Sequence, residues 1–278
     1  MIVRQPKISF HDVVPHWCRT PELAQSLNAG SIAAPHVETF LNRTMAQASD
    51  LLDSNDEALK TDIKLFRKQE GNHLRIHLGF NKRFYEFGYG QVRALEQELE
   101  EDLKRFVNTK SLRFNLAYCV GFECFANYLS KYIFEGIPHL LEGADPSALE
   151  LWRWHVAEEY EHRAVCHESY VRLFGAWWKL GYFFRVYGLV YSMIHLMGLN
   201  KRMIAAMLKQ DREKMDYAEI QNSEARVRKL ERTSTKFLIA NMFSILVPGY
   251  NPRNDRPARG LREFLAAYDA GSAERLQT

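Results

Sequence analysis

The chain has 278 residues, of which 46% are hydrophobic and 26% are charged, a composition that is typical of globular proteins and excludes wholesale disorder. Lys and Arg together number 37 and Asp and Glu number 34, so the formal net charge is only +3. A charge this small argues against general electrostatic binding of nucleic acid, and the length suffices to bury a sizeable core.

Apolar residues recur at helical spacing through most of the chain, and no long alternation of period two indicates a strand. The first helix is predicted to start at Pro35, which suits a first turn, and to end near residue 52. The other predicted helices span about 56–87, 91–107, 112–134, 145–174, 174–199, 201–233 and 260–268. We expect one all-α domain over 1–278, with a ferritin-like four-helix bundle at about 35–174 and accessory helices at about 175–278.

The segment 174–199 is rich in aromatic residues and long enough to span a bilayer, but Lys179, Arg185 and His195 interrupt it. A charge near the centre of a membrane helix costs about 2.5–3.5 kcal/mol, so a buried or interfacial helix is predicted instead. Peripheral membrane contact or a homodimer face are alternative roles for it. The N-terminus lacks the apolar core of a signal peptide and the four cysteines form no CxxC pair, so a cytoplasmic protein with buried free thiols is expected.

Two Glu-x-x-His motifs carry the strongest chemical signal. One runs from Glu70 to His73 and the other from Glu159 to His162, on separate predicted helices. Residues three apart lie on the same face of a helix, so each motif points one carboxylate and one imidazole in the same direction.

Two further predicted helices each contribute one acid, Glu38 in PHVETF and Glu123 in VGFECFANY. Glu123 interrupts an apolar stretch, where a carboxylate without a counter-charge is costly. The pattern Glu, Glu-x-x-His, Glu, Glu-x-x-His is the ligand set of ferritin-like proteins that bind two metal ions. Four carboxylates neutralise two divalent ions, and the mixed oxygen and nitrogen donors favour two Fe, with Mn/Fe, Mn/Mn or Zn as alternatives.

Three more side chains share the faces of these motifs. His155 lies four residues before Glu159 and is predicted to be a seventh metal ligand, with a ligand-orienting or core role as the alternative. His77, four residues after His73, and Asn127, four residues after Glu123, are predicted to orient ligands by hydrogen bonding. Six other histidines have no predicted role: His11, His16, His36, His139, His167 and His195.

The spacing His-x-x-x-Glu-x-x-His at residues 155–162 resembles that of the p-aminobenzoate N-oxygenase class of di-iron enzymes, in which the additional histidine binds one iron. The chain also resembles the bacterial family described as predicted metal-dependent hydrolases, a ferritin-like group. The stretches that carry this resemblance are PHW, PHVETF, FRKQEGNHLRIHLGFN and LWRWHVAEEYEHRAV, which together span most of the first 170 residues.

Two positions depart from that family pattern. Val37-Glu38 stands where Gly-Glu is expected, which keeps the acid and therefore its implied role as a ligand. His167-Glu168 stands where the family tends to have Phe-Asp, which puts a contact near the ligands or substrate in doubt.

These observations support three functions. The leading hypothesis is an oxygenase or oxidase with two Fe, O2 as co-substrate, an external electron donor and a small-molecule substrate that could be apolar, with the segment after Phe174 as a pocket wall. The alternative is a metal-dependent hydrolase that uses a metal-activated water, as the family resemblance implies. The third is a non-catalytic storage or structural bundle. The sequence contains no phosphate-binding glycine motif and no GxSxG nucleophile motif.

Overall fold

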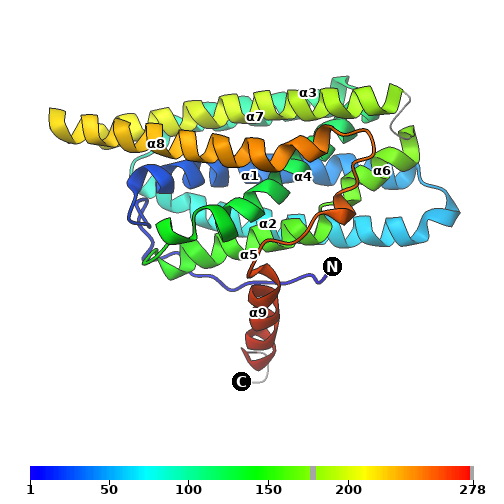
Figure 1. The fold of residues 1–278 in the computed structure, drawn as a ribbon, viewed down its shortest axis with the longest axis horizontal. Helices are drawn as coiled ribbons and strands as arrows, with labels where there is room; N and C mark the ends of the chain where they lie inside the picture. Colours follow the sequence, from blue (N-terminus) through cyan, green and yellow to red (C-terminus); the bar gives the residue numbers. More distant parts are fainter. Residues whose placement is uncertain (176–179, 276–278) are drawn as a thin grey trace.

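The computed structural model describes residues 1–175 and 180–275, and among them it contains helices and turns but no strand, which confirms the predicted all-α fold (Figure 1). Short 3₁₀ and π turns connect the longer elements. The α-helices are α1 (Pro21–Asp50), α2 (Glu57–Glu86), α3 (Arg93–Thr109), α4 (Leu112–Lys131), α5 (Pro146–His162), α6 (Val165–Phe174), α7 (Leu180–Arg212), α8 (Tyr217–Met242) and α9 (Leu261–Arg275).

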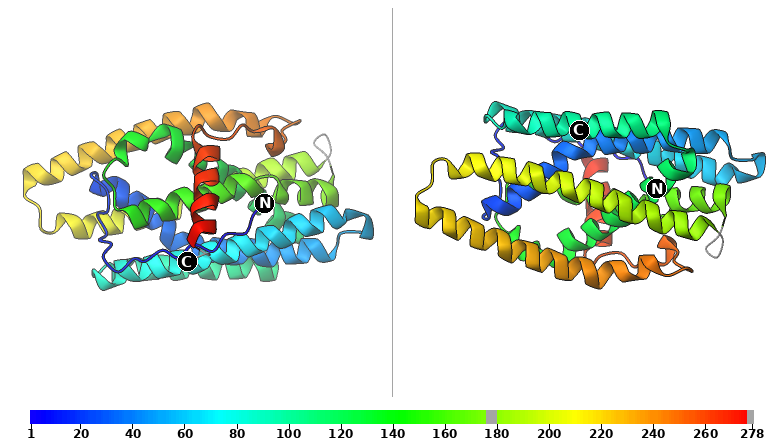
Figure 2. Two further views of the ribbon diagram at one scale, coloured as in Figure 1. Left: turned by 90° about the horizontal axis from the view of Figure 1, so that it is seen from below. Right: turned by 90° about the horizontal axis from the view of Figure 1, so that it is seen from above.

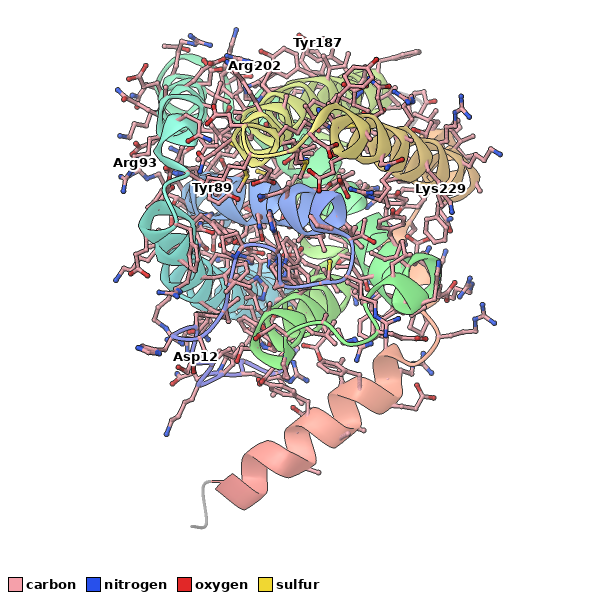
Figure 3. The ribbon with its side chains drawn as sticks, turned by 90° about the vertical axis from the view of Figure 1, so that its left-hand side faces the viewer. Asp12, Tyr89, Arg93, Tyr187, Arg202 and Lys229 are labelled. Atoms are coloured by element: carbon pink, nitrogen blue, oxygen red, sulfur yellow. The ribbon has the colours of Figure 1, made fainter. Side chains whose placement is uncertain are left out.

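Four helices surround a common interior. Helix α1 packs on α2, α2 on α5, α5 on α4, and α4 returns to α1, so the four form a closed bundle. Large apolar side chains fill it, with Phe40, Phe66, Tyr118 and Trp154 all fully buried. Seen along the helices, α7 and α8 cover α1 and α4, while α2 and α5 lie on the other side (Figure 3).

Helix α7 lies unusually close to α4. A Cβ atom built on Gly188 would lie 2.6 Å from the carbonyl carbon of Ala117, and one built on Gly121 would lie 2.7 Å from Cα of Leu189. Real Cβ contacts are longer, so only glycine allows the two backbones to approach this closely. The helix that was expected to be an accessory element is therefore packed directly against the bundle.

The outer face of α7 carries exposed apolar side chains, among them Phe183, Tyr187, Val190 and Ile194. Within the described residues, no helix is both long enough and apolar enough to cross a membrane.

The predicted start of the first helix is wrong by four turns, because α1 begins at Pro21 and Pro35 lies inside it. A proline in a helix interior has no N–H to donate to the carbonyl four residues earlier, here that of Ser31. The side-chain amide of Asn81 on α2 donates to that Ser31 carbonyl oxygen instead, at 2.9 Å. A contact between two helices therefore replaces the bond that the proline removes.

Two other predicted boundaries also differ. The helix expected over 145–174 starts as predicted, with Asp145 accepting hydrogen bonds from the first turn, but it breaks after His162 into α5 and α6. At the break, the Arg163 guanidinium donates to the carbonyl oxygen of Tyr160 at 2.6 Å, which satisfies that carbonyl without a further helical turn. The expected boundary near residue 200 lies within α7, which continues to Arg212.

The two ends of the chain meet near α5. The N-terminal segment runs along α2 and α5, and Asn72 of α2 donates to the Arg4 carbonyl oxygen at 2.7 Å. Helix α9 crosses beneath α5 (Figure 2) and packs on it through a small apolar cluster that includes Ala157 and Leu261. Arg4 donates to Asp269 of α9 and to Glu158 of α5, so its side chain joins the N-terminal segment and α9 to the bundle.

Candidate metal centre

The side chains predicted to bind metal converge inside the four-helix bundle, and each is at least nine-tenths buried. Glu38 comes from α1, Glu70 and His73 from α2, Glu123 from α4, and His155, Glu159 and His162 from α5.

Six of these residues form two groups of metal-binding atoms. One atom each of Glu70, His73, Glu159 and His162 lie within 4.8 Å of one another, and Glu38, His73 and His155 form a second group of the same kind. We call these six residues the carboxylate–histidine cluster. Because His73 belongs to both groups, they adjoin each other, as two neighbouring ion sites would.

Nitrogen and oxygen atoms face one another closely in this cluster. His155 Nε2 lies 2.8 Å from Glu159 Oε1, and His162 Nε2 lies 3.2 Å from Glu70 Oε1. His73 Nδ1 lies 3.5 Å from Glu159 Oε1. These separations allow one ion to contact both atoms of a pair after small side-chain adjustments.

Many of the cluster atoms have no hydrogen-bond partner among the described residues. They are both carboxylate oxygens of Glu38 and of Glu70, Oε2 of Glu159, Nδ1 of His73 and Nε2 of His162. Buried polar atoms are normally paired, and leaving them unpaired costs free energy. A divalent cation satisfies such atoms together, and a carboxylate and imidazole donor set without thiolate suits iron, manganese or zinc. The residues present therefore fit a metal site.

The ionisation of these acids supports the same reading. Burial raises the pKa of Glu38, and burial together with Glu159 raises the pKa of Glu70 to about 7 and also raises that of Glu123. Burial also opposes the charged form of Glu159, yet His162 and the other imidazoles hold its pKa well below the usual range. Added positive charge is therefore needed before all of these carboxylates can be ionised together.

The sequence analysis missed Glu158, which orients His73. Glu158 Oε2 lies 3.1 Å from His73 Nε2, and Arg4 donates to the other oxygen of Glu158 at 3.1 Å. Burial opposes the charge of Glu158, but His73 and Arg4 lower its pKa, so the ionised carboxylate accepts the Nε2 proton. His73 then presents Nδ1 to the cluster, a common arrangement for metal-binding histidines. The spacing in the sequence could have revealed the role of Glu158, since Glu158 is three residues after His155 and four before His162.

Glu123 has a similar place beside His162. Its Oε2 lies 3.1 Å from His162 Nδ1, which leaves His162 Nε2 facing Glu70. Glu123 belongs to neither group of metal-binding atoms, although its other oxygen has no partner within the described residues. The structure therefore places this predicted ligand where it can orient His162.

His155 is oriented by a chain of hydrogen bonds that runs through His77. The Ser31 hydroxyl donates to Asn81 Oδ1 at 2.6 Å, so its oxygen accepts a proton from His77 Nδ1 at 2.7 Å. Burial keeps the pKa of His77 well below its ordinary value, so His77 Nε2 is free to accept from His155 Nδ1 at 2.5 Å. His155 Nε2 then carries no proton to donate to the ionised Glu159 carboxylate 2.8 Å away, so these two electron-pair donors need a cation between them, as metal ligands do.

Asn127, predicted to orient Glu123, faces elsewhere in the structure. Its side-chain amide donates to Asp255 Oδ2 at 2.7 Å, and Asp255 also accepts from Tyr250. The loop after α8 supplies this acceptor, which lies more than a hundred residues away in sequence.

The four cysteines are free and buried, as expected.

The comparisons with known proteins give one match. No curated protein and no solved structure matches the chain significantly. The sequence model of one family, described as "Predicted metal-dependent hydrolase", matches residues 2–256. This range includes every residue of the carboxylate–histidine cluster and nearly the whole chain. The chain therefore belongs to the predicted metal-dependent hydrolase family.

Proposed function

We propose that the chain is a metal-dependent hydrolase whose carboxylate–histidine cluster binds two divalent ions. The observation that carries this proposal is the set of buried, unpartnered carboxylate and imidazole atoms that face one another inside the bundle. The family description supports hydrolysis more directly than the oxygenase chemistry expected from ligand type alone.

The protein side chains have distinct tasks in this proposal. Glu38, Glu70, Glu159 and the three imidazoles hold the ions, which supply Lewis-acid activation of water and of a substrate carbonyl. His155 and Glu159 also line an apolar cavity of about 120 Å³, so a substrate reaches the cluster from this side. The surrounding apolar walls limit bulk water, which strengthens electrostatic interactions at the site.

Elemental analysis of the freshly purified protein tests the site. We expect about two metal ions per chain, and replacement of Glu159 by Gln should reduce this content strongly while circular dichroism shows an intact fold. Glu161→Gln is the matched control on the same helix, because Glu161 pairs with Arg4 and lies outside the cluster. Wild-type metal content in Glu159→Gln would exclude this site.

A panel of esters and amides tests the reaction. Under nitrogen, the metal-loaded protein should release acid and alcohol or amine from a member of the panel, and a chelator should stop turnover. Turnover that survives complete metal removal would contradict the proposal.

An O2-activating oxygenase or oxidase remains a second candidate, supported by two observations. The cluster combines three carboxylates with three imidazoles, a mixture of donor types that di-iron proteins also use, and it adjoins an apolar cavity. Anaerobic loading with Fe(II) followed by exposure to air separates the candidates. Oxygen uptake with a reductant would favour the oxygenase, whereas its absence together with hydrolysis under nitrogen would favour the hydrolase.

A further inference from the structure

Two adjoining cavities lie beside the carboxylate–histidine cluster. The inner cavity, about 120 Å³, lies between α1, α4, α5 and α7, with His155 and Glu159 at one end. The outer cavity, about 230 Å³, lies between α1, α4, α7 and α8. Six residues line both: Gly30, Phe125, Leu129, Trp152, Met197 and Asn200. The two cavities therefore adjoin, and we refer to them together as the passage.

The inner part of the passage is apolar and narrow. Small residues make room for it, among them Ala33 and Ala34 on α1 and Gly121 on α4. The Ser192 hydroxyl in its wall already donates to the Leu189 carbonyl oxygen. Besides the cluster end, this part offers two buried polar atoms without a hydrogen-bond partner among the described residues, Trp152 Nε1 and Asn200 Oδ1, both on residues shared with the outer cavity.

The outer part is larger and mostly apolar, although Ser26, Ser234, Thr235 and the buried carboxylate of Glu22, which pairs with Arg226, also line it. Leu27, Ile204 and Leu230 come from three different helices and face this cavity. Charged residues occur at its rim, where Lys201 of α7 and Glu231 of α8 are exposed. A long apolar group can therefore stay out of water from the cluster almost to the surface.

We infer that the substrate is an ester or amide of a straight-chain aliphatic acid, with its carbonyl at the His155–Glu159 end and its chain in the passage. This inference rests on the proposed function for the reacting group, whereas the two cavities alone account for the chain. Hydrolysis of such an ester consumes one water and releases the free acid and an alcohol, with no oxidant or reductant. The product carboxylates are therefore suitable binding probes.

Calorimetric titration of the metal-loaded protein with butanoate, octanoate and dodecanoate measures the contribution of the chain. Each added methylene that leaves water should strengthen binding about fourfold until the passage is filled. Equal affinities for the three acids would overturn the inference.

Substitutions within each cavity locate the bound chain. Ala33→Leu places extra volume in the inner cavity and should weaken octanoate about tenfold or more. Ala46→Leu is the matched control, because Ala46 is also half-buried on α1 and lines neither cavity. Val227→Trp fills only the outer cavity, so it should weaken dodecanoate and leave butanoate unchanged.

These measurements also separate the two proposals. Two metal ions per chain with hydrolysis of short esters, but no dependence on chain length, would overturn the substrate inference and leave the hydrolase intact. Chain-length dependence in a protein that binds no metal would refute the hydrolase and retain the passage. If Ala33→Leu fails to fold, Val227→Trp decides: unchanged dodecanoate affinity overturns the inference.

Discussion

Two groups of charged residues lie side by side around α5, and their carboxylates are neutralised in different ways. In the first, Arg4 donates to Glu158, Glu161 and Asp269, and no atom of these residues is among the buried unpartnered ones. In the carboxylate–histidine cluster, acids meet imidazoles and many atoms have no partner within the described residues. The first group contains its own counter-charge, the Arg4 guanidinium, whereas the carboxylate–histidine cluster suits a cation supplied from outside the chain.

His73 connects the two groups. Its Nε2 contacts Glu158, which Arg4 holds, while its Nδ1 faces Glu70 and Glu159. The ion pair of Arg4 and Glu158 thus orients His73, which belongs to the carboxylate–histidine cluster. This comparison predicts that substitutions in the two groups change stability in opposite directions when metal is absent.

The largest effect is expected for Arg4→Met in the first group. Removal of the guanidinium leaves Glu158 buried without its cation, which should lower the free energy of unfolding by about 3–5 kcal/mol. Thermal unfolding should show this as a Tm lower by roughly 6–20 °C. The control is Arg202→Met, because Arg202 pairs with Glu98 at an exposed position, where loss of the ion pair should have little effect on stability. Similar effects of both variants would contradict the comparison.

In the cluster, Glu70→Gln should act in the opposite direction. At pH 8 the metal-free variant lacks a buried negative charge, so it should be more stable than the metal-free wild type by roughly 1–3 kcal/mol. The metal-loaded wild type should be the more stable of the two, because metal binding stabilises the folded state. Denaturant unfolding of the two proteins, with and without a chelator, measures these two differences in stability. Glu57→Gln, at an exposed position on the same helix, is the control.

The pH dependence sharpens this prediction. Glu70 has a pKa of about 7 in the folded, metal-free chain and an ordinary value of 4.5, so the folded state holds the extra proton between these pH values. The free energy of unfolding of the metal-free wild type should therefore fall relative to Glu70→Gln as pH rises from 4.5 to 7, by up to about 1.4 kcal/mol per pH unit. His77 and His155, whose pKa values burial lowers, titrate in the opposite direction, and their contribution is common to both proteins to a first approximation. Against the opposing effect of burial, Glu70 helps to raise the pKa of His73 above 6.5, so above that pH His73 lowers the stability of the wild type in the same direction as Glu70 does. A stability difference that is independent of pH would argue against a raised pKa of Glu70.

Much of the cluster was predictable because its residues follow helical spacing. Glu70 with His73, and Glu159 with His155 and His162, needed only the rule that residues three or four apart share a face. The structure brings these residues together with Glu38 because α1, α2 and α5 are neighbours in the bundle. The pattern did not specify which nitrogen of each imidazole faces the cluster.

The remaining features depend on contacts between distant parts of the chain. Arg4 contacts Glu158 across 154 residues, and Asn127 turns to Asp255 across 128 residues, so local spacing contains no information about either pair. Pro35 misled the prediction of the first helix because the replacement donor, Asn81, lies on another helix. Tertiary contacts overrode a local preference at that position.

The smallest effect is expected for Ser31→Ala, which removes the acceptor for His77 Nδ1 and leaves the cluster itself unchanged. His77 can then carry its proton on either ring nitrogen, so its Nε2 accepts less often from His155 Nδ1. His155 is therefore less often held with an unprotonated Nε2. Loss of a hydrogen bond made directly to a ligating histidine typically weakens metal affinity by about tenfold to a hundredfold, and Ser31 acts one hydrogen bond further out, so we expect a loss of about tenfold or less, which competition with a chelator measures. Thr39→Ala is the control on α1, since its hydroxyl donates only to the local Pro35 carbonyl oxygen at 2.7 Å. Unchanged affinity in Ser31→Ala would show that the hydrogen bond from His77 to Ser31 does not determine which nitrogen of His155 is protonated, and the contacts of Asn81 and Ser31 would then serve only to hold α1 against α2 where Pro35 interrupts the helix.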